Sequence, residues 1–87
     1  MASAELIVEL KALVLDAAEK TAPEGGLTED EVLFGPDSRL ALDSLDALQV
    51  SMAIQERYGV RMTDSKETRR ALASIANLAR HLSERRA

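Results

Sequence analysis

Residues 40–48, Leu-Ala-Leu-Asp-Ser-Leu-Asp-Ala-Leu, place a serine between two apolar runs and directly behind an acidic residue. Asp43 suits the N-cap of a helix, because its carboxylate accepts hydrogen bonds from the free backbone N–H groups of the first turn. Ser44 then takes the first helical position, where unpaired N–H groups and the positive end of the helix dipole favour an anion. The stretch therefore predicts a helix start at which Ser44 is exposed and suited to carry an anionic group.

The helix that begins at Ser44 is predicted to run to about Tyr58, with Gly59 as its left-handed C-terminal cap. On a helical wheel of about 100° per residue it has two apolar faces. The first face, assigned to the core, contains Ala47, Val50, Ile54 and Tyr58, and the second contains Leu45, Leu48 and Met52. The second face is either additional core, the more common fate of such a stripe, or a contact surface for partner enzymes.

An amphipathic helix is predicted before this one, capped by Ser3 and ended by Ala22-Pro23 and Gly25-Gly26. Its apolar positions recur three and four residues apart: Leu6, Ile7, Leu10, Leu13, Val14, Ala17 and Ala18. A connection from about residue 21 to residue 42 follows, which is unusually long for a helical bundle. Within it we expect a helical turn over Thr28–Glu31 and a turn over Gly35–Ser38. We expect its apolar residues to pin it across the bundle, namely Leu27, Val32, Leu33, Phe34, Leu40 and Leu42.

Two more helices are predicted after Gly59. Thr63-Asp64-Ser65 is a cap-like cluster for a short helix over residues 66–72, and Ser74 caps a last helix. The last helix is expected to face inward with Ile75, Leu78, Ala79 and Leu82. The predicted fold class is therefore all-α: a single domain over residues 1–87, built as a four-helix bundle of three main helices and one short helix, with a long loop between the first two.

Length and composition exclude several classes of function. A chain of 87 residues forms one core but is too small for a substrate cavity with walls of its own, so we do not expect an enzyme. It contains no cysteine, so thiol chemistry would require a prosthetic group. No basic segment with a following apolar run opens the chain, so we expect no signal peptide and no membrane span, and a cytoplasmic location.

The formal net charge of −4 is unevenly distributed. Residues 1–58 carry twelve acids and four bases, whereas residues 59–87 carry three acids and seven bases. The acidic part argues against nucleic acid as a partner and favours basic proteins. The cations of the second part are explained most simply by a solvated face and a helix C-terminus; they are Arg61, Lys66, Arg69, Arg70, Arg80, Arg85 and Arg86.

Asp43-Ser44-Leu45-Asp46, together with the Tyr58-Gly59-Val60 end of the helix, resembles the phosphopantetheine attachment site of acyl carrier proteins. The resemblance covers nearly the whole chain. It implies that Ser44 carries a covalent 4′-phosphopantetheine whose thiol holds acyl groups as thioesters, and that Asp43 helps to bind this cofactor. It also implies a partner-binding surface made of Leu45, Asp46, Gln49, Met52 and Glu56. The implied partners are a phosphopantetheinyl transferase, an acyl-loading enzyme, a ketosynthase and other acyl-processing enzymes, with the carrier itself a monomer.

The sequence departs from this family at informative positions. Ala41 stands where the family often has glycine, from which we expect that the turn before the motif needs no positive φ. Gln49, Gln55 and Arg57 stand where carriers of fatty acid synthesis often have glutamate, while Glu56 is retained. We therefore expect a stand-alone carrier of a specialised lipid or polyketide pathway rather than of bulk fatty acid biosynthesis.

Other functions are possible for such a sequence and are kept as alternatives. One is a small helical protein-interaction module without a cofactor, and another is an aminoacyl or peptidyl carrier. A hydrolase would need His81, the only histidine, beside Ser44, yet no glycine-framed nucleophile motif accompanies the serine. A calcium site is disfavoured because Asp37, Asp43 and Asp46 lack the alternating spacing of an EF-hand loop.

Overall fold

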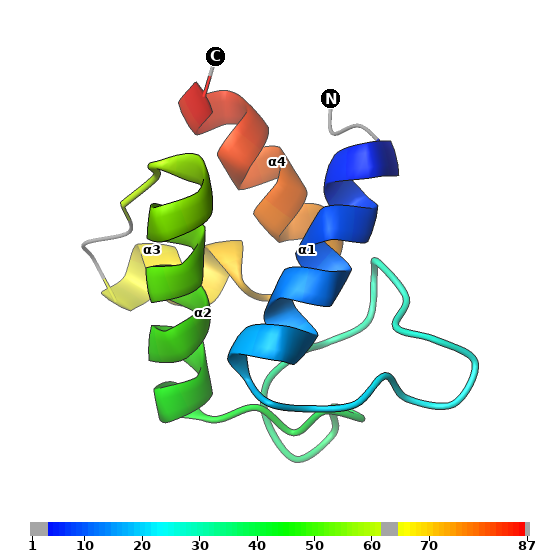
Figure 1. Cartoon of the computed structure of the whole chain (residues 1–87). Coiled ribbons are helices and arrows are strands. Elements are labelled where there is room, and N and C mark those ends of the chain that lie inside the picture. The colour runs from blue at the N-terminus through cyan, green and yellow to red at the C-terminus, as the bar shows by residue number, and fades with distance from the viewer. Residues whose placement is uncertain (1–3, 62–64, 87) are drawn as a thin grey trace.

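The structure is a computed structural model that describes residues 4–61 and 65–86, and these residues form four helices and a long connection (Figure 1). The helices are α1 (Ala4–Ala17), α2 (Ser44–Tyr58), α3 (Ser65–Ala71) and α4 (Ile75–Arg86). Three are main helices and α3 is short, with 7 residues. The predicted all-α fold class and the order of the helices are confirmed.

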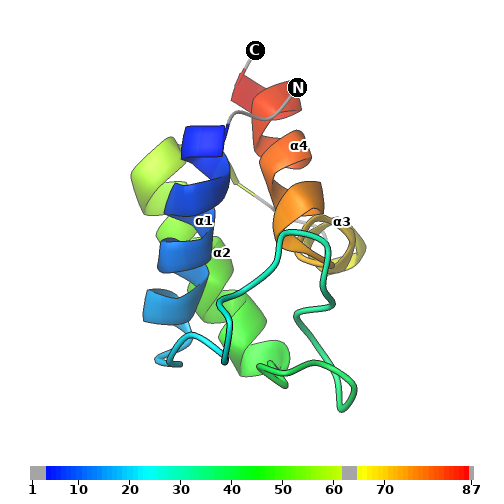
Figure 2. The same ribbon diagram turned by 90° about the vertical axis from the view of Figure 1, so that its right-hand side faces the viewer.

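The core is built where α1 packs against both α2 and α4, while α3 lies across the bundle and contacts α2 and α4. In the view of Figure 2, α3 is seen almost end-on beside α4, and the long connection crosses the lower part of the bundle. The predicted apolar positions meet in this core. Its largest fully buried side chains are Leu10, Val14, Leu33, Val50, Ile54, Leu72, Ile75, Leu78 and Leu82. None of the helices in the described ranges is both long and apolar enough to cross a bilayer.

Helix α2 begins and ends where the sequence predicts. Asp43 is its N-cap, with extended backbone angles, and Gly59 closes it in the left-handed conformation at φ 70°. The Gly59 backbone N–H donates to the Gln55 carbonyl at 2.9 Å, which satisfies one of the free carbonyls at the helix end. Of the predicted core face, Val50 and Ile54 are buried, while Ala47 and Tyr58 are partly buried against the same cluster.

Helix α1 ends earlier than predicted. Its last helical residue is Ala17, and Glu19 takes a positive φ of 55°, well before Ala22-Pro23. Backbone N–H groups of Glu19 and Lys20 donate back to the carbonyls of Asp16 and Leu15, at 3.2 and 2.9 Å. A left-handed residue with such back-bonding closes a helix without glycine or proline, so the breakers that we predicted are not what ends it. The predicted cap at Ser3 lies outside the described residues.

The connection between α1 and α2 is held to the bundle largely as predicted. Leu27, Leu33, Leu40 and Leu42 are buried, and Phe34 is partly buried. Backbone hydrogen bonds also tie it to the α3–α4 junction, because Leu33 N–H donates to Ala73 and Ala76 N–H donates to Glu29. The prediction for Val32 was wrong, since its side chain is 55% exposed.

Two local predictions for the connection had different outcomes. The turn over Gly35–Ser38 is confirmed, with the Ser38 N–H donating to the Gly35 carbonyl at 3.2 Å. The helical turn over Thr28–Glu31 was wrong, because this segment forms a bend. The Thr28 N–H and hydroxyl both donate to the Glu31 carboxylate, at 2.7 and 3.2 Å, so this side chain holds the two ends of the bend together.

The end of the connection is organised by Ser38, a polar side chain buried among apolar residues. Its hydroxyl donates to the Leu33 carbonyl at 2.8 Å and accepts from the N–H groups of Leu40 and Ala41, at 3.1 and 3.2 Å. Ala41 itself adopts φ 48°. Our expectation that this turn needs no positive φ was therefore wrong: the turn is left-handed, and here alanine adopts a conformation that glycine adopts more easily.

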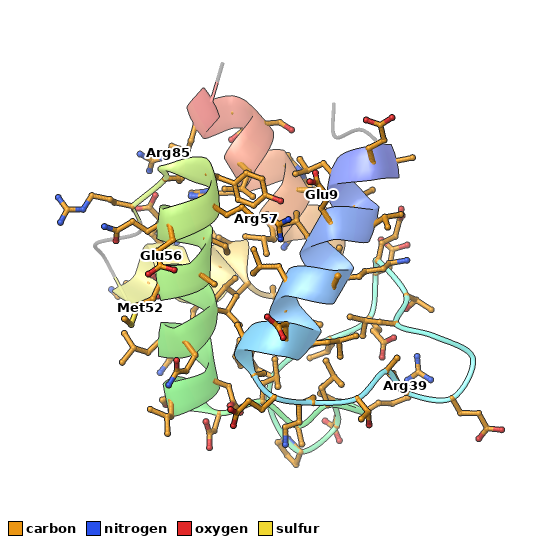
Figure 3. All side chains as sticks on the ribbon, viewed as in Figure 1. Glu9, Arg39, Met52, Glu56, Arg57 and Arg85 are labelled. Carbon is orange, nitrogen blue, oxygen red and sulfur yellow. The ribbon has the colours of Figure 1, made fainter. Side chains whose placement is uncertain are left out.

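An ion pair between Arg39 and Glu31 holds the outer part of the connection. The Arg39 guanidinium makes a bidentate contact with Glu31, with Nε to Oε2 at 2.9 Å and Nη2 to Oε1 at 2.6 Å. Its remaining donors reach the carbonyls of Glu24 and Gly26, at 2.7 and 2.8 Å. The hydrogen bond from Arg39 lowers the pKa of Glu31 from 4.5 to about 2. Figure 3 shows Arg39 in this loop, away from α2.

The C-terminal half agrees with the predicted pattern. Helix α3 spans Ser65–Ala71, one residue earlier at each end than predicted, and the proposed cap residues Thr63 and Asp64 lie outside the described residues. Ser74 caps α4, because its hydroxyl accepts from the Asn77 N–H at 3.1 Å. The predicted inward residues of α4, Ile75, Leu78, Ala79 and Leu82, are all fully buried.

Candidate functional site

Ser44 is the first residue of α2, and its side chain is exposed. The buried Leu42 anchors the chain two residues earlier, so the serine is held at a defined point of the surface. Backbone hydrogen bonds reinforce this anchor: Leu42 N–H donates to Leu33 at 3.2 Å, and Gly35 N–H donates to Leu42 at 3.3 Å. Within the described residues, no group makes a hydrogen bond to the Ser44 hydroxyl. The hydroxyl is therefore accessible on a rigid support.

Asp43 and Asp46 form a reciprocal capping box around this serine. The Asp46 N–H donates to Asp43 Oδ1 at 3.0 Å, and the Asp43 N–H donates to Asp46 Oδ2 at 3.1 Å. The hydrogen bond donated by the Asp46 backbone holds the pKa of the Asp43 carboxyl below its ordinary value. Asp43 is therefore ionised at neutral pH, and it acts as an acceptor that fixes the first turn rather than as a proton donor.

An open groove of about 930 Å³ lies between α2 and α3, and Ser44 is one of the residues that line it. On the α2 side it is lined by Asp43, Ser44, Ala47, Leu48 and Ser51, and on the α3 side by Lys66, Thr68, Arg69 and Arg70. Val32, Phe34, Leu42, Leu72 and Ala73 complete its lining. A group attached to Ser44 thus has a largely apolar surface beside it.

The residues predicted to bind partners lie on the outside of α2. Leu45, Leu48 and Met52 are 62, 54 and 53% exposed and follow one another at helical spacing. Gln49 and Glu56 are exposed, and Asp46 is partly buried by its role in the capping box. Met52 and Glu56 project from α2 in Figure 3. Of the two fates left open for the second apolar face, the structure excludes burial in the core of this chain.

The structure does not bring His81 to Ser44. His81 lies in a separate, more polar depression between α3 and α4, lined among others by Glu67 and Arg85 and not by Ser44. Its Nε2 lies 3.5 Å from Glu67 Oε1, and Arg85 pairs with the same carboxylate. Ser44 and His81 therefore do not form a nucleophile–base pair. Across the described part of the chain, no three histidine or acidic side chains gather in a way that could hold a metal ion.

Sequence reasoning missed two sets of residues around the site. Ser38 and Arg39, which shape the connection leading to Ser44, have no periodic pattern that could have revealed them, because their partners are loop carbonyls and a distant carboxylate. The cations of α3 were read as a solvated face, yet Arg69 and Arg70 line the same groove as Ser44. Their spacing in the sequence gave no sign of this, since only the crossing of α3 over α2 puts them there.

Comparison with known proteins identifies the family. The family model described as "Phosphopantetheine attachment site" matches residues 5–82. The chain is also 33% identical to the acyl carrier protein of Thermosynechococcus vestitus over 70 residues, which cover 76% of this chain and 75% of that relative. No solved structure gives a significant match.

The family is defined by a covalently attached 4′-phosphopantetheine, and its members are carriers rather than enzymes. The residues present fit such a group. Ser44 offers an exposed hydroxyl that no group in residues 4–61 and 65–86 binds, at a helix start whose dipole favours a phosphodiester, and an open groove lies beside it for an attached arm. The chain belongs to the phosphopantetheine-binding acyl carrier protein family.

Proposed function

We propose that Ser44 carries the 4′-phosphopantetheine and that the chain presents acyl intermediates to the enzymes of a specialised lipid or polyketide pathway. The observation that carries the proposal is the exposed Ser44 hydroxyl at the first position of α2, which lines the groove and has no hydrogen-bond partner among the described residues. When bound, the prosthetic group supplies a thiol that holds acyl groups as thioesters. The chain has no cysteine to supply one itself.

Three other serines, Ser38, Ser51 and Ser74, are less suited to modification because their hydroxyls are engaged. Ser38 is buried and hydrogen-bonded to the Leu33 carbonyl. Ser51 donates to the Leu48 carbonyl at 2.9 Å, and Ser74 caps α4. Modification at Ser38 or Ser51 would remove a proton that is donated to a backbone carbonyl, and modification at Ser74 would crowd the cap of α4, whereas modification at Ser44 would break no hydrogen bond within the described residues.

The neighbours of Ser44 then have defined tasks. Asp43 and Asp46 hold the first turn of α2 in place, so that a transferase meets the serine in one geometry. Leu45 and Met52 offer exposed apolar contacts for partner enzymes, with Gln49 and Glu56 as polar contacts beside them. The arm itself raises the effective concentration of the cargo at each enzyme that docks on this surface. A monomeric state and a cytoplasmic location remain predictions of the same proposal.

Intact mass measurement tests the attachment site. After incubation with coenzyme A, magnesium and a broad-specificity phosphopantetheinyl transferase, the wild type should gain the mass of one phosphopantetheine. Ser51→Ala is the matched control and should gain the same mass, while Ser44→Ala should gain none. Gain by Ser44→Ala would refute the assignment, and no gain by the folded wild type would favour an interaction module without a cofactor.

The specialised pathway is supported by the charge of α2. Gln49, Gln55 and Arg57 are exposed, so the partner-facing helix offers fewer acids to basic enzyme surfaces than a helix with glutamates there. Rim charges act mainly on the rate of encounter, and each is worth about 1 kcal/mol or less at an exposed position. The three residues should therefore shift the preference for partners rather than abolish contact.

A charge-swap experiment tests this part of the proposal. The holo protein should be a poor substrate for a fatty acid synthesis ketosynthase and acyltransferase, and Gln49→Glu with Gln55→Glu and Arg57→Glu should improve it at moderate salt. Arg61→Glu with Arg80→Glu changes the net charge equally but lies off α2, so it should have less effect. Equal rates and equal salt dependence for wild type and the α2 variant would remove the argument for a specialised carrier.

A further inference from the structure

The groove beside Ser44 has two chemically different walls. Beyond its first turn, α2 contributes Leu48 and Ser51 and no charged residue, whereas α3 contributes Lys66, Arg69 and Arg70. The lining contains one carboxylate, that of Asp43, which is already engaged as the cap of α2. The groove therefore combines an apolar surface with three cations on its α3 side.

This arrangement bears on where an attached cargo can lie. A cargo that lies in the groove meets the side chains that line it. These include the apolar Leu48 and Leu72 and the exposed Arg69 and Arg70. A wholly apolar cargo in the groove would therefore contact the two guanidinium groups. Contact with an apolar group would strip water from a guanidinium without giving it a partner, which is unfavourable. A cargo that ends in an anion would instead give it a charge-assisted hydrogen bond.

We propose that the α3 wall of this groove is a binding site for acyl cargo that carries a distal carboxylate, with Arg69 as the main contact. The inference rests on the proposed attachment at Ser44 and adds a class of cargo to it. Both arginines are exposed and line the groove. Arg70 also lines the depression around His81, whereas Arg69 does not, so Arg69 is assigned as the main contact.

Two cargoes of equal chain length test the proposal: hexanoyl and adipoyl groups, each loaded with its arm from the acyl-coenzyme A onto the full chain, with loading verified by intact mass. The holo protein without cargo is the reference, because its shifts report contacts of the arm's own phosphodiester. Backbone amide NMR spectra should show additional shifts in α3 for adipoyl, larger than those for hexanoyl and reduced by salt. An exposed cation changes the docked population about five-fold at most, so the effect should be graded.

Variants separate a site from general electrostatics. Arg69→Gln should reduce the adipoyl-specific shifts and Arg69→Lys should keep most of them, while Arg61→Gln, an exposed cation outside the groove, should leave them unchanged. The same spectra show that each variant is folded. Equal α3 shifts for the two cargoes, shifts already complete in the unloaded holo protein, or equal losses in Arg69→Gln and Arg61→Gln would overturn the proposal. Failure of the wild type to load at Ser44 would instead refute the attachment on which it rests.

Discussion

Truncation of Leu10 should destabilise the fold far more than truncation of Met52, although both are large apolar residues on helices. Leu10 on α1 is 0% exposed, whereas Met52 on α2 is 53% exposed. Replacing a fully buried leucine with alanine costs about 3–5 kcal/mol, from lost burial and the cavity that remains. A half-exposed side chain leaves no enclosed cavity, and such surface changes cost about 0.5 kcal/mol.

The expected loss of stability in Leu10→Ala is large relative to the total free energy of unfolding. A chain of this length has a free energy of unfolding of about 4–13 kcal/mol, so Leu10→Ala removes a major share of it. Each kcal/mol corresponds to a change in Tm of about 4–8 °C in a domain of this size. Leu10→Ala should therefore lower the Tm by at least about 12 °C, and Met52→Ala by about 4 °C or less.

Urea unfolding followed by far-UV circular dichroism measures the loss of unfolding free energy in both variants, and thermal unfolding followed by the same signal measures the change in Tm. Ile54→Ala is the matched control on the same helix as Met52, and it should resemble Leu10→Ala because Ile54 is also 0% exposed. An unchanged m-value would show that the variants unfold to comparable states. If Met52→Ala proved as damaging as Leu10→Ala, the division of α2 into a core face and a partner face would be refuted.

Two further predictions concern the connection before the site. The pKa of Glu31 is lowered to about 2, so the stability that its ionised form contributes is complete above its ordinary pKa of 4.5 and is lost as the pH falls from there toward 2. In urea melts, the wild type should therefore exceed Arg39→Gln in unfolding free energy by more at neutral pH than at about pH 3. A difference in unfolding free energy that does not change with pH would contradict the Arg39–Glu31 pairing. Ala41 has φ 48°, a conformation that costs a non-glycine residue about 1–2 kcal/mol. Glycine avoids this cost but loses about 0.4–1 kcal/mol to the greater freedom of the unfolded chain, so Ala41→Gly should raise the unfolding free energy by about 0.5 kcal/mol. A lower unfolding free energy in Ala41→Gly would show that the turn is not strained.

Much of this fold was predictable from local pattern. Asp43 and Gly59 delimit α2 because a cap and a left-handed closure depend on residues within one turn of the helix end. The buried positions of α1 and α4 follow from helical periodicity for the same reason. Ser44 could be singled out because its place at the start of α2 depends on the Asp43 cap and on neighbours in the motif, which are all local.

The errors lie where the partners are distant or the backbone is irregular. Ala41 was expected to avoid a positive φ, but the Ser38 hydroxyl binds its N–H and bends the chain into that conformation. Val32 has the same apolar character as Leu33, yet only Leu33 faces the core. In an irregular segment the inward-facing positions do not recur at a regular spacing, so residue type alone does not show which side chain is buried.

The order of the helices, the caps of α2, the N-cap of α4, the core stripes and the serine that starts α2 could be predicted from the sequence, because each depends on interactions between residues a few positions apart. The tertiary structure alone decided what surrounds that serine. The second apolar face of α2 remains exposed because the helices that contact α2, namely α1 and α3, leave it uncovered. The cations of α3 line the groove because the chain carries α3 back across α2. The charge of a short helix cannot be assigned to a site from sequence, because only packing shows which other element lies beside it.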